Sequence, residues 1–334
     1  MSHLTFAEAT VVGFIQGVTE LFPMSSLGHN VLIPALVGGS WARDLNVSSP
    51  ESPYLAFIVG LHVATAIGLI IYFWRDWLRI IGGFFTSFRD GGPHTTEQKL
   101  AWMIVIATIP VGLVGLVAEH TFRVLFGKAV IAAYFLMANG VILYIGERFR
   151  PQTSKLADEQ AAQERQAATD RELATVSPGQ RMAGRHASGH AVIRQEEFSE
   201  AVRADNRLSK IGFVQATIIG STQILALFAG ISRDGIVMVG GMFRGLSRVD
   251  AARFSFLLSA PVILAAGALK IGDLFGPLGN GIRGQILAGS ILSGIGAYLS
   301  VRFLVRYLQT RTLTPFAIYC FLFGLASVIY LNVK

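Results

Sequence analysis

Five side chains that could do chemistry stand near the start of the chain, within the largely apolar stretch 9–37. They are Gln16, Glu20, Ser25, Ser26 and His29. Gln16 and Glu20 are four residues apart and would share one face of a helix. The two serines follow Pro23, where a broken helix would restart with open backbone N–H groups and a dipole that favours an anion. Such residues could bind a phosphate group and place a hydroxyl nucleophile beside a carboxylate base.

A second apolar stretch, 211–242, is broken in a similar way. Its break supplies Ser232, Arg233, Asp234 and Gly235. The planar donor fork of arginine suits bidentate binding of phosphate. Taken together, the two breaks offer a carboxylate, hydroxyls, an imidazole, a guanidinium and open amides. This set suits phosphoryl transfer, because that reaction depends on positioning and charge neutralisation more than on elaborate covalent chemistry.

Each of these residues also has a purely structural interpretation. Glu20 and Arg233 could form an ion pair only, the serines could only cap helices, and His29 could be a hydrogen-bonded packing residue. His62 stands alone in the charge-free stretch Tyr54–Trp74. We interpret His62 as a buried core histidine rather than a catalyst.

The elements that position these residues are predicted to be membrane helices. The 334 residues are 52% hydrophobic and only 15% charged, whereas soluble domains carry about 25% charged residues. Six stretches contain no Lys, Arg, Asp or Glu and approach or exceed the roughly 20 residues that a spanning helix needs. They are Tyr54–Trp74, Ala101–Ala118, Ala129–Gly146, Phe254–Leu269, Gln285–Val301 and Leu313–Leu331. The predicted fold is an all-α polytopic membrane protein with six transmembrane helices.

The two broken stretches are predicted to be re-entrant helical hairpins, because non-helical backbone at membrane depth occurs only where it is buried in protein or lines a wet cavity. If the first hairpin enters from outside, the segments placed inside hold 21 of the 28 Lys and Arg residues, and the outside segments hold only Arg43, Arg123 and Lys128. This asymmetry fits the positive-inside rule. Each half, one hairpin and three spans, would then be inverted relative to the other, as in inverted-topology repeats.

The chain divides accordingly into a first repeat at 1–150, a polar cytoplasmic connector at 151–208 and a second inverted repeat at 209–334. Within the connector, Asp158–Leu173 is predicted to form an exposed polar helix, and Ser177–Gly189 is predicted to be flexible. We interpret the connector as a solvated linker, with a regulatory or lipid-headgroup-binding arm as the alternative. The net charge of +7 is assigned to cytoplasmic loops, and nucleic-acid binding is not expected. No removable signal peptide is expected, because the first ten residues have no cluster of positive charge and no small-residue cleavage site.

The motifs at the two breaks resemble those of the bacterial undecaprenyl-diphosphate phosphatase family, the type associated with bacitracin resistance. That family carries Glu/Gln-x-x-x-Glu followed by Pro-x-Ser-Ser-x-Gly-His, which stands here as Gln16 and Glu20 followed by the run 23–29. Its second motif, Pro-Gly-x-Ser-Arg-Ser-Gly, stands here as the run 229–235. The resemblance extends over nearly the whole chain except the connector.

The resemblance implies a multi-pass enzyme of the bacterial inner membrane, with an active site that opens to the extracytoplasmic side. The enzyme would remove the terminal phosphate of undecaprenyl diphosphate and so return the carrier lipid to peptidoglycan synthesis. The resemblance implies Glu20 as base or metal ligand, Ser26 as nucleophile or phosphate contact, His29 in proton transfer and Arg233 as diphosphate ligand. Whether Ser26 or His29 attacks phosphorus stays open.

Further expectations concern ligands and partners. Gln16, Ser25, Ser232 and Gly235 are predicted to contact the substrate. The expected cofactor is a divalent metal, Mg²⁺ or Ca²⁺, because hard cations bridge carboxylate and phosphate oxygens. The expected partners are the polyprenyl diphosphate lipid and the bilayer, and a homodimer is allowed.

Three positions depart from the family pattern: Asp234 replaces a serine, Ala229 a proline and Leu27 a threonine. Our hypothesis is that Asp234 supplies the metal-binding charge that the neutral Gln16 lacks. The alternative is that Asp234 neutralises Arg233 and weakens diphosphate binding.

The favoured function is therefore a polyprenyl diphosphate phosphatase. One alternative is a polyprenyl-phosphate flippase or another transporter of anionic substrates, because inverted repeats with broken hairpins are a transporter design. A lipid-binding relative without turnover is the third interpretation.

Overall fold

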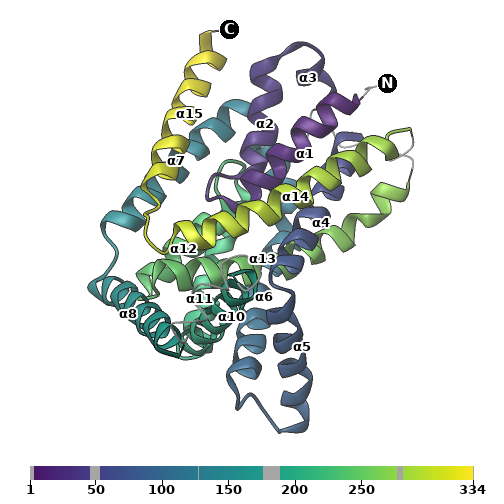
Figure 1. The fold of residues 1–334 in the computed structure, drawn as a ribbon. Helices are drawn as coiled ribbons and strands as arrows, with labels where there is room; N and C mark the ends of the chain where they lie inside the picture. Colours follow the sequence, from purple (N-terminus) through teal and green to yellow (C-terminus); the bar gives the residue numbers. More distant parts are fainter. Residues whose placement is uncertain (1–3, 46–52, 127, 176–188, 277–280, 334) are drawn as a thin grey trace.

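The computed structural model describes residues 4–45, 53–126, 128–175, 189–276 and 281–333. Within these ranges the secondary structure is helical and contains no strand (Figure 1). The helices are, in chain order, α1 (Phe6–Leu21), α2 (Ser26–Val37), α3 (Gly39–Asp44), α4 (Pro53–Tyr72), α5 (Trp74–Arg89), α6 (Thr96–Phe126), α7 (Ala129–Arg148), α8 (Gln152–Thr175), α10 (Gly189–Leu208), α11 (Phe213–Ser221), the 3₁₀ helix η1 (Thr222–Leu227), α12 (Arg233–Phe243), α13 (Arg248–Phe275), α14 (Arg283–Tyr307) and α15 (Thr314–Val333).

Five of the six predicted spans are confirmed as helices long and apolar enough to cross a membrane, namely those within α6, α7, α13, α14 and α15. The sixth predicted span, Tyr54–Trp74, corresponds to α4, which ends two residues earlier, at Tyr72. The chain bends by 89° between Phe57–Tyr72 and Trp74–Arg89, and these two segments meet the same criterion only as a pair. A second bent pair, Ser199–Leu208 with Phe213–Leu227, turns by 99°. The described residues thus hold five to seven candidate spans.

Both predicted breaks are present, each between two short apolar helices. α1 and α2 are separated by residues 22–25, and η1 and α12 by residues 228–232. The second break is shorter than the sequence suggested. Arg233, Asp234 and Gly235 belong to the first turn of α12 and not to the break itself.

Helices that are far apart in the sequence pack in reciprocal pairs. α1 of the first half lies against α14 of the second, and α11 of the second half lies against α6 of the first. α7 and α15 lie side by side (Figure 1). Gly13 permits the first of these contacts, because a Cβ atom there would lie 2.7 Å from the Cα of Gly289.

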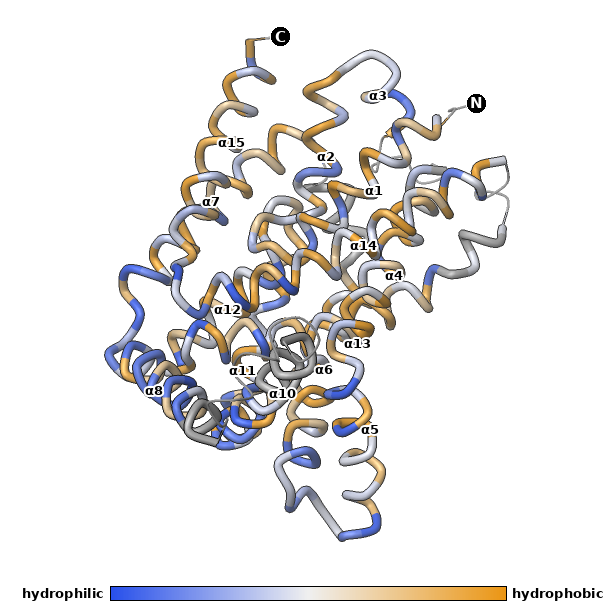
Figure 2. Tube along the Cα trace, viewed as in Figure 1, coloured by the Kyte–Doolittle hydropathy of each residue, from blue (hydrophilic) through white to orange (hydrophobic). Residues whose placement is uncertain are grey.

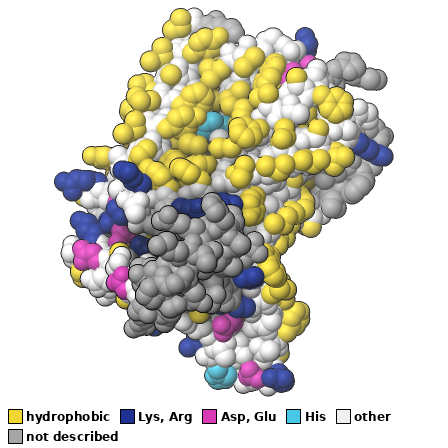
Figure 3. All heavy atoms as spheres, viewed as in Figure 1, with side chains coloured by type: hydrophobic (Ala, Val, Ile, Leu, Met, Phe, Trp, Pro, Cys, Tyr) yellow, Lys and Arg dark blue, Asp and Glu magenta, His cyan; other side chains and the backbone are white. Residues whose placement is uncertain are grey.

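Polar and charged residues gather at one end of the helical bundle. The connector helix α8 is mostly hydrophilic (Figure 2), and it covers the helix predicted at Asp158–Leu173. Almost all of the segment predicted to be flexible, Ser177–Gly189, lies outside the described residues. α8 is tied to the membrane helices because Arg248 at the start of α13 donates to Asp158 at 2.7 Å. Hydrophobic side chains cover most of the upper part of the face seen in Figure 3.

A buried ionic cluster fixes the corner between α4 and α5 at this polar end. Arg253 of α13 donates to Asp205 of α10 at 2.8 Å and to Asp76 of α5 at 2.9 Å. Arg79 donates to both carboxylates as well, at 2.6 and 2.8 Å. Three helices from distant parts of the chain are thereby held together.

Candidate active site

The two breaks touch each other inside the bundle. Gly28 at the start of α2 lies so close to Gly230 that a Cβ on Gly28 would be 2.9 Å from the Cα of Gly230. The backbone N–H of Gly230 donates to the Ser25 hydroxyl at 3.2 Å. Gly230 has φ 114, a conformation that glycine adopts without strain. Gly28 and Gly230 therefore allow the two breaks to approach each other closely.

Asn139 of α7 joins the two breaks from behind. Its side-chain N–H donates to the carbonyl of Pro23 in the first break, at 3.0 Å. Its carbonyl oxygen accepts from the N–H of Ser232 in the second break, also at 3.0 Å. One buried amide thus pairs with one backbone group of each break, as buried backbone polar groups require.

Each break ends in a serine cap. Ser25 has φ 66 and is the one non-glycine residue in the described ranges with positive φ. Its hydroxyl accepts from the N–H of Gly28 at 3.3 Å. The Ser232 hydroxyl accepts from the N–H of Gly235 at 3.1 Å. Consequently Ser26 and Arg233 are the first residues of α2 and α12, at the positive ends of two helix dipoles.

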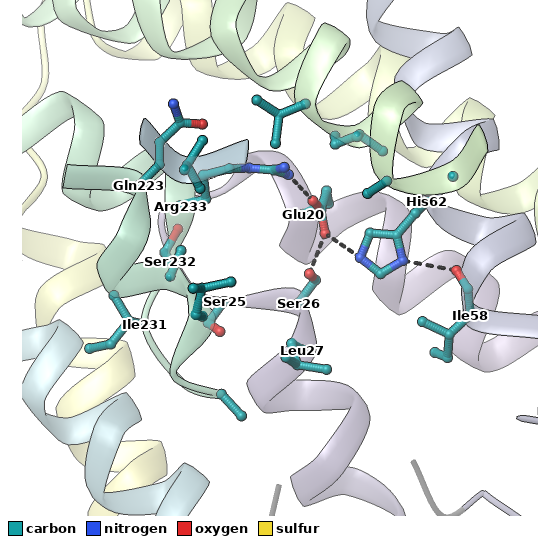
Figure 4. Close-up of a pocket in the computed structure, with 18 of the residues that line it drawn as sticks. Glu20, Ser25, Ser26, Leu27, Ile58, His62, Gln223, Ile231, Ser232 and Arg233 are labelled. Atoms are coloured by element: carbon teal, nitrogen blue, oxygen red, sulfur yellow. Dashed lines mark hydrogen bonds and ion pairs between the residues drawn. The ribbon is translucent and has the colours of Figure 1, made fainter. Parts of the chain in front are cut away.

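Glu20 is the centre of the polar group, and its partners include Ser26 and Arg233, the residues that follow the two breaks (Figure 4). One of its oxygens accepts from the Arg233 guanidinium, and the other accepts from the Ser26 hydroxyl. Gln16 donates to the second oxygen at 2.9 Å and is itself held by Asn30 at 2.5 Å. The carboxylate is buried but fully paired, as a charge in such a setting must be.

A cavity of about 330 Å³ opens beside this carboxylate. Its polar wall contains Glu20, Ser25, Ser26, His62, Gln223, Ser232, Arg233 and Lys270. The rest of its lining is apolar and comes from α2, α4, α6, η1, the second break and α13. Among the cavity residues, Arg233 retains a buried Nε–H and Gln223 a buried carbonyl oxygen without a hydrogen-bond partner. A polar end with unused hydrogen-bonding groups and an apolar body suits an amphiphilic ligand.

The structure brings together five of the predicted site residues at the cavity: Glu20, Ser25, Ser26, Ser232 and Arg233. Gln16 and Gly235 lie just behind the wall, where they support Glu20 and the Ser232 cap. They orient the residues that line the cavity and do not line it themselves.

His29 does not line the cavity. One ring nitrogen lies 2.8 Å from the backbone carbonyl of Ser25, and the other lies 2.8 Å from the hydroxyl of Tyr319. The ring stacks on Tyr319 and Phe323 of α15 and is only 2% exposed. The role of His29 in proton transfer stays a prediction, because the ring is not part of the cavity wall.

Asp234 also lies away from the cavity. One carboxylate oxygen accepts from Ser255 and Ser259 of α13, each at 2.6 Å. The other oxygen is buried and unpartnered. The side chain is fully buried, although it follows Arg233 directly in the sequence.

This arrangement does not fit a metal ion bound jointly by Glu20 and Asp234. Both oxygens of Glu20 are occupied by protein donors, and the carboxylate of Asp234 is held against α13. In the part of the chain that the structure describes, no group of three His, Cys, Asp or Glu side chains could hold a metal. A divalent ion would have to find its ligands largely on the substrate.

Two polar residues at this site were not predicted from the sequence to be functional. His62 on α4 lines the cavity, and its Nε2 lies 3.5 Å from the Glu20 carboxylate. Asn139 joins the two breaks but was not singled out. In both cases the available signal was a polar side chain inside a charge-free span, which is costly in a membrane and therefore informative.

Comparison with known proteins shows the family to which this chain is similar. The family model described as bacitracin resistance protein BacA matches residues 9–176 and 185–326. A protein of Mycolicibacterium paratuberculosis named undecaprenyl-diphosphatase is 54% identical over all of this chain and 99% of its own length. Undecaprenyl-diphosphatase 2 of Frankia alni is 50% identical, with 97% of each chain covered. A protein of the same name from Chromobacterium violaceum is 36% identical over 97% of this chain and 98% of its own.

Proposed function

This chain belongs to the family of the bacitracin resistance protein BacA, and we propose that it hydrolyses undecaprenyl diphosphate to undecaprenyl phosphate and inorganic phosphate within the membrane. Relatives that carry the name undecaprenyl-diphosphatase match it over nearly their whole length. Identity of 50% or more at full coverage supports the same activity. The alternative of a transporter is not favoured by these relatives.

The observation that carries the proposal is the pairing of Glu20 with the first residues of both α2 and α12, at the polar end of an apolar cavity. Glu20 accepts from the hydroxyl of Ser26 and from the guanidinium of Arg233. A nucleophile, a base and a phosphate ligand are thereby adjacent, as phosphoryl transfer requires. The apolar lining would hold the first isoprene units of the lipid, and the diphosphate would lie at the polar end.

In the proposed mechanism Ser26 is the nucleophile. Its Oγ forms a bond to the terminal phosphorus, and the bond from that phosphorus to the bridging oxygen breaks. The Ser26 proton passes to Glu20, whose carboxylate already accepts it as a hydrogen bond. Arg233 and the open N–H groups at the start of α2 neutralise the charge on the phosphate oxygens. His29 does not line the cavity, and we therefore assign the attack on phosphorus to Ser26.

A divalent ion, Mg²⁺ or Ca²⁺, remains part of the proposal. Because Glu20 has no unoccupied oxygen, the ion would be bound mainly by oxygens of the diphosphate and by water. When bound, it would neutralise charge on the diphosphate.

We also propose the finer architecture, six spans and two re-entrant hairpins related as an inverted repeat. The reciprocal pairs α1 with α14 and α11 with α6 support this arrangement, as do the matching serine caps. The cavity is lined by the later part of α13, whereas the start of α13 binds the connector helix α8. If the basic connector is cytoplasmic, the cavity opens towards the extracytoplasmic side of a bacterial plasma membrane. The homodimer stays a prediction.

The function can be tested with purified protein in detergent. Phosphate release from undecaprenyl diphosphate would be measured with Mg²⁺, with Ca²⁺ and with EDTA. We expect metal-dependent release that is lost in Glu20→Ala and in Arg233→Ala. No release from folded wild-type protein would contradict the proposal, and a lipid-flipping assay in liposomes would then follow.

A further inference from the structure

The imidazole that faces the cavity belongs to His62, a residue outside both motifs. Its Nε2 lies 3.5 Å from the Glu20 carboxylate, and its side chain is 27% exposed through the cavity. Its Nδ1 lies 2.8 Å from the backbone carbonyl of Ile58, one turn earlier on α4 (Figure 4). The ring is thus held by its own helix and directed at the site.

The contact with Ile58 determines where the ring carries its proton. A carbonyl oxygen only accepts hydrogen bonds, so Nδ1 must be the protonated nitrogen. In the neutral ring Nε2 then bears the lone pair, on the side of Glu20 and the cavity. This is the orientation of a proton acceptor whose tautomer is fixed by a second hydrogen bond.

Proton balance in the proposed reaction requires such a second acceptor. In the first step Glu20 receives the proton of Ser26. In the second step the phosphoserine bond breaks, and the Ser26 oxygen must recover a proton. Glu20 is the donor in contact with that oxygen. Glu20 therefore cannot also accept the proton of the attacking water.

We propose that His62 is a further catalytic residue, the base that accepts the proton of the hydrolytic water; this rests on the proposed function. The water oxygen forms a bond to the phosphorus of phosphoserine 26 while its proton moves to Nε2 of His62. The bond between phosphorus and the Ser26 oxygen breaks, and Glu20 returns its proton to that oxygen. The imidazolium then gives its proton to the departing phosphate or to solvent, which restores both groups.

The decisive experiment compares wild type, His62→Gln and His94→Gln. Gln keeps a hydrogen-bonding side chain but cannot carry the proton. His94 is exposed on the connection between α5 and α6 and serves as the matched control. We expect His62→Gln to lower kcat about 100-fold or more, in the range of proton-transfer catalysis. KM should change by less than about threefold, because substrate binding is left to Arg233 and the apolar wall.

Two further readouts separate catalysis from structure. If water attack is slowed, phosphate should accumulate on Ser26 in His62→Gln, and mass spectrometry of the peptide that contains Ser26 would detect it. Added imidazole should restore part of the activity of His62→Gly, because the cavity is large enough to admit it. A purely structural histidine would show neither effect. If His62→Gln fails to fold, His62→Asn would be assayed in its place.

The outcomes distinguish this inference from the function beneath it. An inactive wild-type protein would contradict both the phosphatase proposal and the proposed catalytic role of His62. An active wild type with a His62→Gln protein that keeps kcat within about threefold would overturn the inference alone and leave the phosphatase in place. Loss of kcat without phosphoserine and without rescue by imidazole would also overturn it.

Discussion

The two breaks are built on the same local plan. In the first, the Ser25 hydroxyl accepts from the N–H of Gly28, three residues later. In the second, the Ser232 hydroxyl accepts from the N–H of Gly235, again three residues later. Each serine starts a short helix whose positive end lies at the cavity.

The breaks differ in the residue that follows the cap. The first presents Ser26, a hydroxyl that donates to Glu20 of the same hairpin. The second presents Arg233, a permanent cation that reaches Glu20 from the other half of the chain. One capping plan thus supplies the reacting group in one half and the charge in the other. This difference predicts that substitution of Ser26, after the first break, changes kcat, and that substitution of Arg233, after the second, changes KM.

The largest expected effect is that of Ser26→Ala. If the first break carries the nucleophile, kcat should fall by about 1,000-fold or more while the protein stays folded. Ser327→Ala is the matched control, because Ser327 is also a buried helical serine but bonds only the carbonyl of Phe323. Phosphate release would be measured for both. A Ser26→Ala protein with more than about a tenth of wild-type kcat would end the assignment of Ser26 as nucleophile.

Arg233→Lys should sharpen the comparison from the side of the second break. Lysine keeps the charge but loses the planar fork that can hold Glu20 and a phosphate at once. We expect KM for the diphosphate to rise about 10- to 100-fold, which matches the loss of a hydrogen bond to a charged group, with a smaller change in kcat. The exposed Arg302 gives the control Arg302→Lys. A fall in kcat with unchanged KM would contradict the division between the breaks.

Asn139→Ala tests whether the breaks act as one unit. The substitution leaves the carbonyl of Pro23 and the N–H of Ser232 without their buried partner. We expect a loss of about 2 kcal/mol or more in stability and a fall in both kcat and apparent affinity. Thermal unfolding in detergent and the phosphate assay would be compared with Asn332→Ala, at an exposed position near the end of α15. Unchanged stability would show that the breaks hold their positions independently.

Much of this architecture could be predicted from the sequence because its signals are local. Charge-free runs of membrane length marked the spans, and Pro23 and Gly230 marked the breaks. The charge-free run ends at Trp74, next to the 89° bend, but the helix beyond the bend, α5, was not predicted because Arg75 and Asp76 end the apolar run. The corner depends on Arg253, an ion-pair partner that is distant in the sequence.

The two histidines show why the site was only partly predictable. His29 stands three residues after Ser26, so a helix places the two side chains on the same face. Only the packing of α15 reveals that Tyr319 takes up the His29 ring. His62 is 36 residues from Ser26 in the sequence. Its proximity to Glu20 follows from the contact of α4 with α1, which no local pattern encodes.

The smallest expected effect is that of Asp234→Asn, and it decides how far the second break takes part in chemistry. Asp234 directly follows the cation Arg233, but its carboxylate is held by Ser255 and Ser259 and does not line the cavity. We therefore expect kcat and KM to change by less than about threefold, a barrier change well under 1 kcal/mol, and the response to Mg²⁺ and EDTA to stay as in wild type. Asp170→Asn, on the exposed face of α8, is the control. If Asp234→Asn instead abolished the response to metal, Asp234 would be a metal ligand after all. The second break would then supply more than charge and binding, because its helix would have to turn Asp234 away from α13 during the reaction.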